Sequence, residues 1–193
     1  MASSVLETRR ASDFGGIARD KNTERVFVGP NLIGQMAVTG TWALEANTNV
    51  QSLATDDAGS TNLLSIPFIA PYSDLIVRGS SAVDRGVKVI GLEIIYEVAA
   101  SALSDADLYI YKTTFDAEGT GTATVVTTTT TMDTAGDAGT EIDQHRMYVT
   151  IAENNRFFLD GGTIVHGIFD VDDGTSSDVN ILGAIWHIQR VEE

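Results

Sequence analysis

Residues 87–98 read VKVIGLEIIYEV, and this stretch decides the fold of the chain. From Ile90 onward every second residue is large and apolar, whereas the alternate positions include Glu93 and Glu97. A period of two with one polar face is typical of a strand in an antiparallel sheet that buries only one side. We therefore expect a half-buried strand here.

Other short apolar runs of the same kind recur along the chain and are separated by turn residues such as Asp, Asn and Gly. They lie at residues 36–44, 62–66, 108–115, 122–132, 145–152, 163–171 and 179–191. No long helical pattern interrupts them. The sequence predicts an all-β fold, an antiparallel jelly-roll-like β-sandwich of about eight strands.

The aromatic residues divide between core and surface. Trp42 and Trp186 fall inside apolar strand patterns, so we expect both in the core. In the strand predicted at 108–115, Tyr109 and Tyr111 share one face and aliphatic side chains occupy the other. One of these two faces is therefore either a second buried layer or a contact surface.

The composition excludes several classes of function. The chain has 27 acidic residues against 12 Lys and Arg, a net charge of −15, and no cysteine. A chain with this excess of acidic residues does not neutralise the phosphates of a nucleic acid, so we expect no nucleic-acid partner. No stretch reaches the roughly 18 apolar residues that span a bilayer, and the first residues lack the layout of a secretory signal. We expect no membrane partner.

The N-terminal segment differs from the rest of the chain. Of the 12 basic residues, 5 fall within residues 1–25. This segment has no long apolar run, so we predict an extended arm at residues 1–30 and a sandwich domain at 31–193. A disordered terminus is the alternative. The arm residues expected to bind a neighbouring subunit are Arg9, Arg10, Phe14, Ile17 and Arg19.

One acidic loop near the C-terminus resembles a calcium site, because Ca²⁺ prefers several carboxylate oxygens on a tight turn. The candidate ligands are Asp170, Asp172, Asp173 and Asp178. Their spacing departs from the EF-hand pattern. We favour a solvated hairpin loop at this place and expect no cofactor.

The histidines are His145, His166 and His187, each on a predicted strand. His166 and His187 are expected on neighbouring strands of one hairpin, where a cupin-like barrel would bind a metal. The H-x-H pair followed by Glu that this hypothesis requires is not present. There is also no G-x-S-x-G motif. The sequence predicts that the protein is not an enzyme.

Taken together, several traits resemble the capsid decoration proteins of tailed viruses. These traits are the polar arm from Ala2 to Pro30, a Thr-, Gly- and Ala-rich sandwich that includes Thr127 to Thr131, and the lack of cysteine and of a catalytic motif. The resemblance implies a virion structural protein, assembled in the host cytoplasm. It also implies a homo-oligomer, with a trimer favoured, that docks through its arm on a capsid or other virion protein and stabilises the shell.

Two alternatives stay open. A carbohydrate- or receptor-binding β-sandwich of a tail or surface structure predicts exposed aromatic side chains. A cupin-like metalloenzyme, the second alternative, predicts a transition metal bound by the histidines.

Overall fold

The computed structural model describes ten segments of the chain, which are residues 23–38, 43–47, 50–55, 62–68, 86–99, 103, 105–127, 143–159, 163–172 and 178–191. The described residues form eleven strands, β1 Thr23–Val28, β2 Gly34–Val38, β3 Ala43–Asn47, β4 Val50–Thr55, β5 Asn62–Pro67, β6 Gly86–Ala99, β7 Asp105–Phe115, β8 Gly121–Thr127, β9 Asp143–Thr150, β10 Thr163–Asp172 and β11 Asp178–Val191. Two 3-10 helices, η3 Pro30–Leu32 and η5 Glu153–Asn155, complete the set. Within these segments no helix is long and apolar enough to cross a bilayer.

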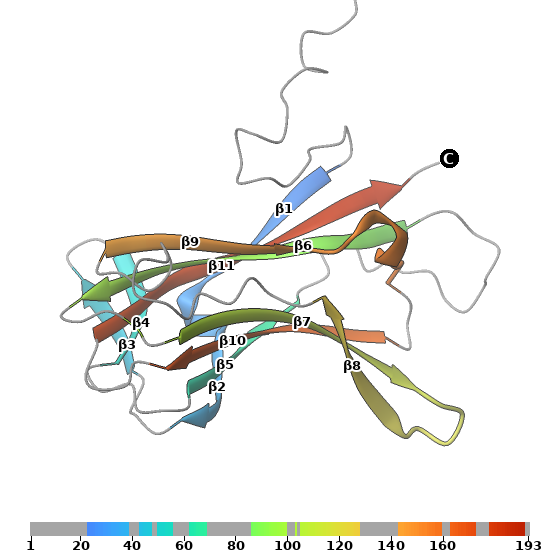
Figure 1. Ribbon diagram of the computed structural model, residues 1–193, viewed down its shortest axis with the longest axis horizontal. Helices are drawn as coiled ribbons and strands as arrows, with labels where there is room; N and C mark the ends of the chain where they lie inside the picture. Colours follow the sequence, from blue (N-terminus) through green and yellow to red (C-terminus); the bar gives the residue numbers. More distant parts are fainter. Residues whose placement is uncertain are drawn as a thin grey trace, which may run out of the picture.

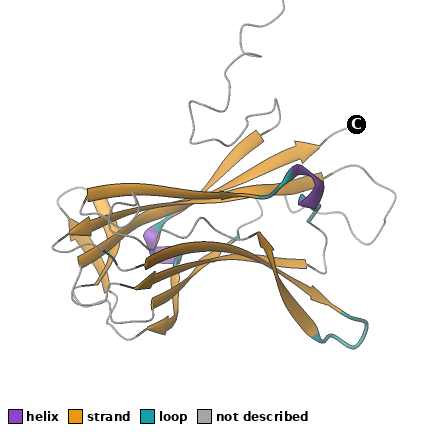
Figure 2. Cartoon of the chain, viewed as in Figure 1, coloured by secondary structure: helices purple, strands orange, loops and turns teal. Residues whose placement is uncertain are grey.

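The strands form two antiparallel sheets that lie face to face (Figures 1 and 2). Sheet A has the order β3-β4-β11-β6-β9, and β1 pairs with the same edge of β11 that β4 uses further along. Sheet B has the order β2-β5-β10-β7-β8. The predicted jelly-roll-like β-sandwich is confirmed. It has more strands than the eight expected, partly because β1 falls within the segment predicted as an arm.

The core lies between the two sheets and is built by the alternation of each strand. Leu92, Ile94 and Tyr96 of β6 face Leu108 and Phe169 of sheet B, and all are fully buried. The predicted core position of Trp186 is confirmed as well, and its indole N–H donates a hydrogen bond to the carbonyl oxygen of Pro67 across the sandwich, 2.9 Å away. Trp42 lies outside the described residues.

Strand β6 differs from the prediction of a strand with one polar face. It lies between β11 and β9 in sheet A, and Glu93 on its outer face is only 3 % exposed. Val87 and Val89, near the start of the strand, belong to the core, because a register shift between Gly91 and Val89 reverses the alternation there. A central strand has neighbours on both edges, so its outward side chains are covered more easily than those of an edge strand.

Strand β1 begins the sandwich earlier than the predicted boundary at residue 30. It pairs with β11 from Thr23 opposite Gln189 to Val28 opposite Ala184, and Val28 is fully buried. Gly183 of β11, at a register shift between β11 and β6, leaves room for β1. Gly183 has φ +149°, and a Cβ atom there would lie 2.7 Å from the ring of Phe27.

Two predicted connections are corrected. Residues 36–44 do not form one strand, because β2 lies in sheet B and β3 lies in sheet A. Likewise, β10 and β11 are not a hairpin, since β10 belongs to sheet B and β11 to sheet A. Both errors have one cause. The alternation of apolar residues predicts a strand, but it does not indicate to which of the two sheets that strand belongs.

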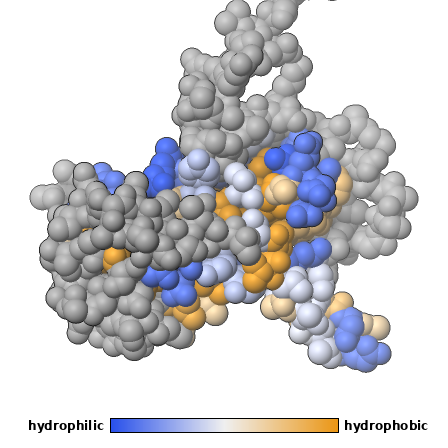
Figure 3. All heavy atoms as spheres, in the orientation of Figure 1, coloured by the Kyte–Doolittle hydropathy of each residue, from blue (hydrophilic) through white to orange (hydrophobic). Residues whose placement is uncertain are grey.

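The β7–β8 hairpin extends sheet B beyond the sandwich. Its turn is fixed by Asp116, whose Oδ1 accepts hydrogen bonds from the backbone N–H groups of Glu118 and Thr120 at 3.1 and 2.7 Å. In the view of Figure 3, hydrophobic residues gather along the middle of the molecule, and the tip of this hairpin is hydrophilic.

Candidate functional site

The outer face of sheet B carries a group of partly buried aromatic side chains. In β7, Leu108 and Ile110 are fully buried in the core, so alternation directs Tyr109 and Tyr111 to the outside. This resolves the question that the sequence left open, since the tyrosine face is the surface and the aliphatic face is the core.

Strand β10 places a third ring beside these tyrosines. His166 lies opposite Tyr111 in the antiparallel register, and the two rings stack with 5.4 Å between centroids and 12° between planes. The rings of Tyr109 and Tyr111 lie 6.2 Å apart. We call Tyr109, Tyr111 and His166 the aromatic platform. Burial lowers the pKa of His166 below its usual value, so the platform is uncharged at neutral pH.

Apolar side chains continue the platform toward one end. Val125 of β8 lies opposite Tyr111 and is 45 % exposed, and Ile164 of β10 is 54 % exposed. Phe115 lies at the same end, and a Cβ atom at Gly121 would lie 2.9 Å from its ring. Exposed apolar residues that adjoin one another on a sheet face are typical of a binding surface.

Carboxylates occupy the other end of the platform. Asp107 and Asp170 are cross-strand partners on the outer face, and Asp105 lies two residues before Asp107 on β7. We call these three residues the acidic end. Asp107 is only 8 % exposed, and its Oδ2 accepts a hydrogen bond of 2.6 Å from the hydroxyl of Tyr109. This bond fixes the ring of Tyr109 relative to the acidic end.

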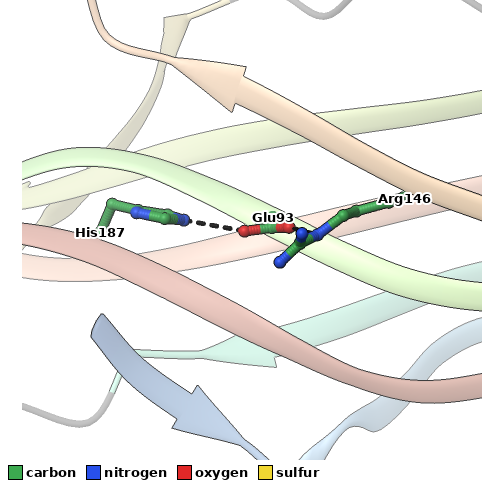
Figure 4. A network of polar contacts seen from close by, with 3 residues as sticks. All are labelled: Glu93, Arg146 and His187. Atoms are coloured by element: carbon green, nitrogen blue, oxygen red, sulfur yellow. Dashed lines mark hydrogen bonds and ion pairs between the residues drawn. The ribbon is translucent and has the colours of Figure 1, made fainter. Parts of the chain in front are cut away.

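A separate polar cluster lies on the outer face of sheet A (Figure 4). The carboxylate of Glu93 forms an ion pair with Nε of Arg146 and a contact of 3.0 Å with Nε2 of His187. Arg25 of β1 lies opposite His187 in the register of β1 and β11. Its pKa is lowered by burial first and by the charge of Arg146 second. The contacts of Glu93 therefore join β9, β6 and β11.

The role of the Glu93 cluster is structural. His187 is 2 % exposed and Glu93 is 3 % exposed, so a substrate cannot reach the pair. Such a buried carboxylate requires its partners, since an unpaired charge in the interior is costly. The cluster links three strands of sheet A by side-chain contacts.

The structure separates the three histidines. His145 lies on the inner face of sheet A with its ring 5.4 Å from that of Tyr96, His166 lies on the outer face of sheet B, and His187 lies on the outer face of sheet A. They do not meet, so the cupin-like metal site is wrong. Within the described segments, no group of three or more acidic, histidine or cysteine side chains is placed to hold a metal ion.

Other predicted site residues lie outside the described residues. These are the arm residues Arg9, Arg10, Phe14, Ile17 and Arg19, and Asp173 of the calcium candidates. Asp172 ends β10 and Asp178 begins β11, whereas the side chain of Asp170 faces outward beside Asp107. The loop between Asp172 and Asp178 connects the two sheets and is not the predicted hairpin.

Sequence reasoning missed His166 as a platform residue. It recognised the tyrosine pair from its spacing, but His166 comes from a strand distant in sequence. The alternation of β10, with Val165 and Phe169 buried, was the available signal that His166 faces outward.

No family model and no curated protein matches this sequence. Solved structures share the sandwich architecture at low identity. One is the CBM22-1 xylan-binding domain of Paenibacillus barcinonensis Xyn10C, with 12 % identity and a TM-score of 0.46 over 91 % of this chain and 99 % of that one. Another is the CBM35 of Cellvibrio japonicus Abf62, with 11 % identity and a TM-score of 0.39 over 88 % and 99 %.

A third similar structure is the enzymatically active domain of tailspike protein 4 from bacteriophage CBA120. It shares 10 % identity and a TM-score of 0.38 over 86 % of this chain and 19 % of that one. At these identities and scores, the likenesses assign the chain neither to a family nor to a ligand.

Proposed function

We propose that this protein binds carbohydrate without catalysis, through the outer face of sheet B. The observation that supports it is the stacked pair of Tyr111 and His166 beside Tyr109, three partly buried rings on one sheet face. Pyranose rings have apolar C–H faces and polar edges. Flat aromatic rings cover such faces, and nearby carboxylates accept hydrogen bonds from the sugar hydroxyls.

The rings of the aromatic platform lie outside the core, where they can serve recognition. The aromatic residues of the core, between the sheets, include Tyr96, Phe169 and Trp186. The rings of the aromatic platform contribute nothing to that core. Such rings lose little conformational entropy when a ligand binds, and partly exposed rigid rings of this kind are common at recognition surfaces.

The test is binding to an array of oligosaccharides, by the wild-type chain and by the double variant Tyr109→Ala/Tyr111→Ala. Tyr148→Ala is the matched control, because Tyr148 is exposed on the outer face of sheet A. We expect the wild type and the control to bind the same glycans and the double variant to lose them. Failure of the wild type to bind any glycan would refute the proposal, as would full binding by a folded double variant.

The virion decoration hypothesis concerns a different part of the chain. The arm residues on which it depends lie outside the described residues, so docking on a capsid protein and trimer formation stay predictions. Carbohydrate binding by sheet B is compatible with a place on a viral tail or surface structure, which was the first alternative from the sequence.

A further inference from the structure

An uncharged band runs along the outer face of sheet B from the aromatic platform toward the tip of the β7–β8 hairpin. Every second residue of β7 from Tyr109 to Phe115 faces outward, and the register places residues of β8 and β10 beside them. None of these described outer-face positions holds an Asp, Glu, Lys or Arg. We call them the outer band, which consists of Tyr109, Tyr111, Thr113 and Phe115 of β7, Gly121, Ala123 and Val125 of β8, and Ile164, His166 and Ile168 of β10.

The more exposed apolar side chains of the outer band lie at the end away from Tyr109. Phe115 and Val125 are each 45 % exposed and Ile164 is 54 % exposed, whereas the rings of the aromatic platform are partly buried. The rings of Tyr111 and His166 also cover each other in part, because they stack. A ligand confined to the aromatic platform would therefore leave the more exposed apolar side chains of the band in water.

The ring of Phe115 packs against the backbone of β8. Gly121 lies opposite Phe115 in the register, and a Cβ atom there would lie 2.9 Å from Cε1 and 3.3 Å from Cδ1 of the ring. The ring thus occupies the space that a side chain at position 121 would need. An aromatic ring commonly covers a glycine of an edge strand in this way. Because the ring is already held against β8, it loses little conformational entropy when a ligand covers its exposed part.

The outer band is longer than a single sugar. Tyr109 and Phe115 are six residues apart on β7, so they lie roughly 20 Å apart at a rise of about 3.3 Å per residue. The register of β7 and β10 has no shift from Tyr109 to Thr114, so the row of outward side chains is continuous.

We infer that the protein binds linear oligosaccharides of several sugar units, which lie along β7 and reach from the aromatic platform to Phe115. This inference rests on the proposed function and adds the shape of the ligand. It also assigns Phe115 as a residue that determines the preference for ligand length. Covering apolar surface is favourable in proportion to its area, so each further sugar that contacts the outer band adds to the affinity until the chain spans the band.

The experiment is calorimetric titration with linear cello-, xylo-, manno- and malto-oligosaccharides, each series from the disaccharide to the hexasaccharide. We expect at least one series to bind, and its hexasaccharide to bind roughly tenfold more tightly than its disaccharide. Phe115→Ala should weaken binding of that hexasaccharide by about fivefold, because the contact with an exposed ring is lost. The same variant should leave the affinity for the disaccharide, which occupies the aromatic platform, unchanged.

Two further variants make the result specific to the position of this ring. Gly121→Ala keeps the ring but takes the space it occupies, and the exposed side chain can turn away without unfolding the strand. It should weaken binding of the hexasaccharide as Phe115→Ala does. Met36→Ala is the matched control, because Met36 is a 53 % exposed apolar residue on β2, at the opposite edge of sheet B. It should change neither affinity.

The outcomes separate this inference from the proposed function. Equal affinity for the disaccharide and the hexasaccharide overturns the inference while the proposed function stands, and so does binding only to branched or single-sugar glycans on the array. A folded Phe115→Ala variant that keeps the wild-type preference for length overturns it as well. If Phe115→Ala does not fold, unchanged binding by Gly121→Ala has the same meaning. Absence of binding to any glycan overturns the proposed function and this inference together.

Discussion

The imidazole of His166 lies parallel to the phenol ring of Tyr111, with 12° between the two planes and 5.4 Å between the ring centroids. The two residues come from neighbouring antiparallel strands, β10 and β7, and are directly opposite in register. A cross-strand pair of this kind stabilises a sheet.

We first predict that this stack contributes measurably to the free energy of unfolding. In a double-mutant cycle of Tyr111→Ala and His166→Ala, the coupling energy should be about 0.5–1.5 kcal/mol, because aromatic pairs add this much beyond the area they bury. Urea denaturation of the wild type, the two single variants and the double variant measures it.

The control cycle combines His166→Ala with Tyr148→Ala, whose positions lie on the outer faces of different sheets. In this cycle the losses of unfolding free energy in the two single variants should add to that of the double variant within about 0.5 kcal/mol. Equal coupling energies in both cycles would mean that the contact between the two stacked rings does not itself contribute to the free energy of unfolding.

The aromatic platform shows how far the sequence alone could lead. The period of two in β7 predicted that Tyr109 and Tyr111 share a face, since alternation is a local property of the strand. It did not predict His166 as their neighbour, because register between distant strands depends on the packing of the whole sheet. Glu93 was predicted on a solvent face for the same reason, as its partners His187 and Arg146 come from two other strands.

The second prediction concerns pH. The folded protein lowers the pKa of His166 below the value of 6.5 for an unperturbed histidine. At pH values between the pKa of His166 in the folded protein and 6.5, the unfolded chain binds more protons than the folded chain. The contribution of His166 to stability is therefore complete above pH 6.5 and falls as the pH decreases. The variant His166→Phe keeps a ring at this position and cannot titrate.

The stability of the wild type relative to His166→Phe should therefore decrease between pH 7.5 and pH 5. Urea denaturation at several pH values measures this difference, and other titrating groups are common to both proteins. A difference that is constant with pH, or that grows in acid, contradicts the expected direction.

Our third prediction is that Glu93 holds sheet A together. The variant Glu93→Ala should lose about 3 kcal/mol of unfolding free energy, because it leaves His187 in the interior without its carboxylate partner. Glu97→Ala is the control on the same face of β6, where the side chain is half-buried and contacts Gln144 at 3.4 Å. It should change stability by about 0.5 kcal/mol. Equal losses of unfolding free energy in the two variants would show that the contacts of Glu93 stabilise sheet A no more than those of Glu97.

The fourth prediction tests the close approach of β6 and β9. A Cβ atom at Gly91 would lie 2.5 Å from the carbonyl oxygen of Val149 and 3.4 Å from the Cα atom of Thr150. Backbone atoms cannot rotate away as a side chain does, so Gly91→Ala must displace β9, at a cost of about 1–3 kcal/mol. Gly34→Ala is the matched control on a strand, because a Cβ atom there meets no atom within 4 Å.

The displacement should be confined to β9, which pairs with β6 alone in sheet A. Amide hydrogen exchange of the Gly91→Ala variant should accelerate across residues 143–150 and stay unchanged in sheet B, because local opening follows the strand that loses its neighbour. Uniform acceleration across both sheets would instead indicate loss of global stability. Unchanged exchange and stability would mean that β9 does not approach β6 as closely as the structure shows.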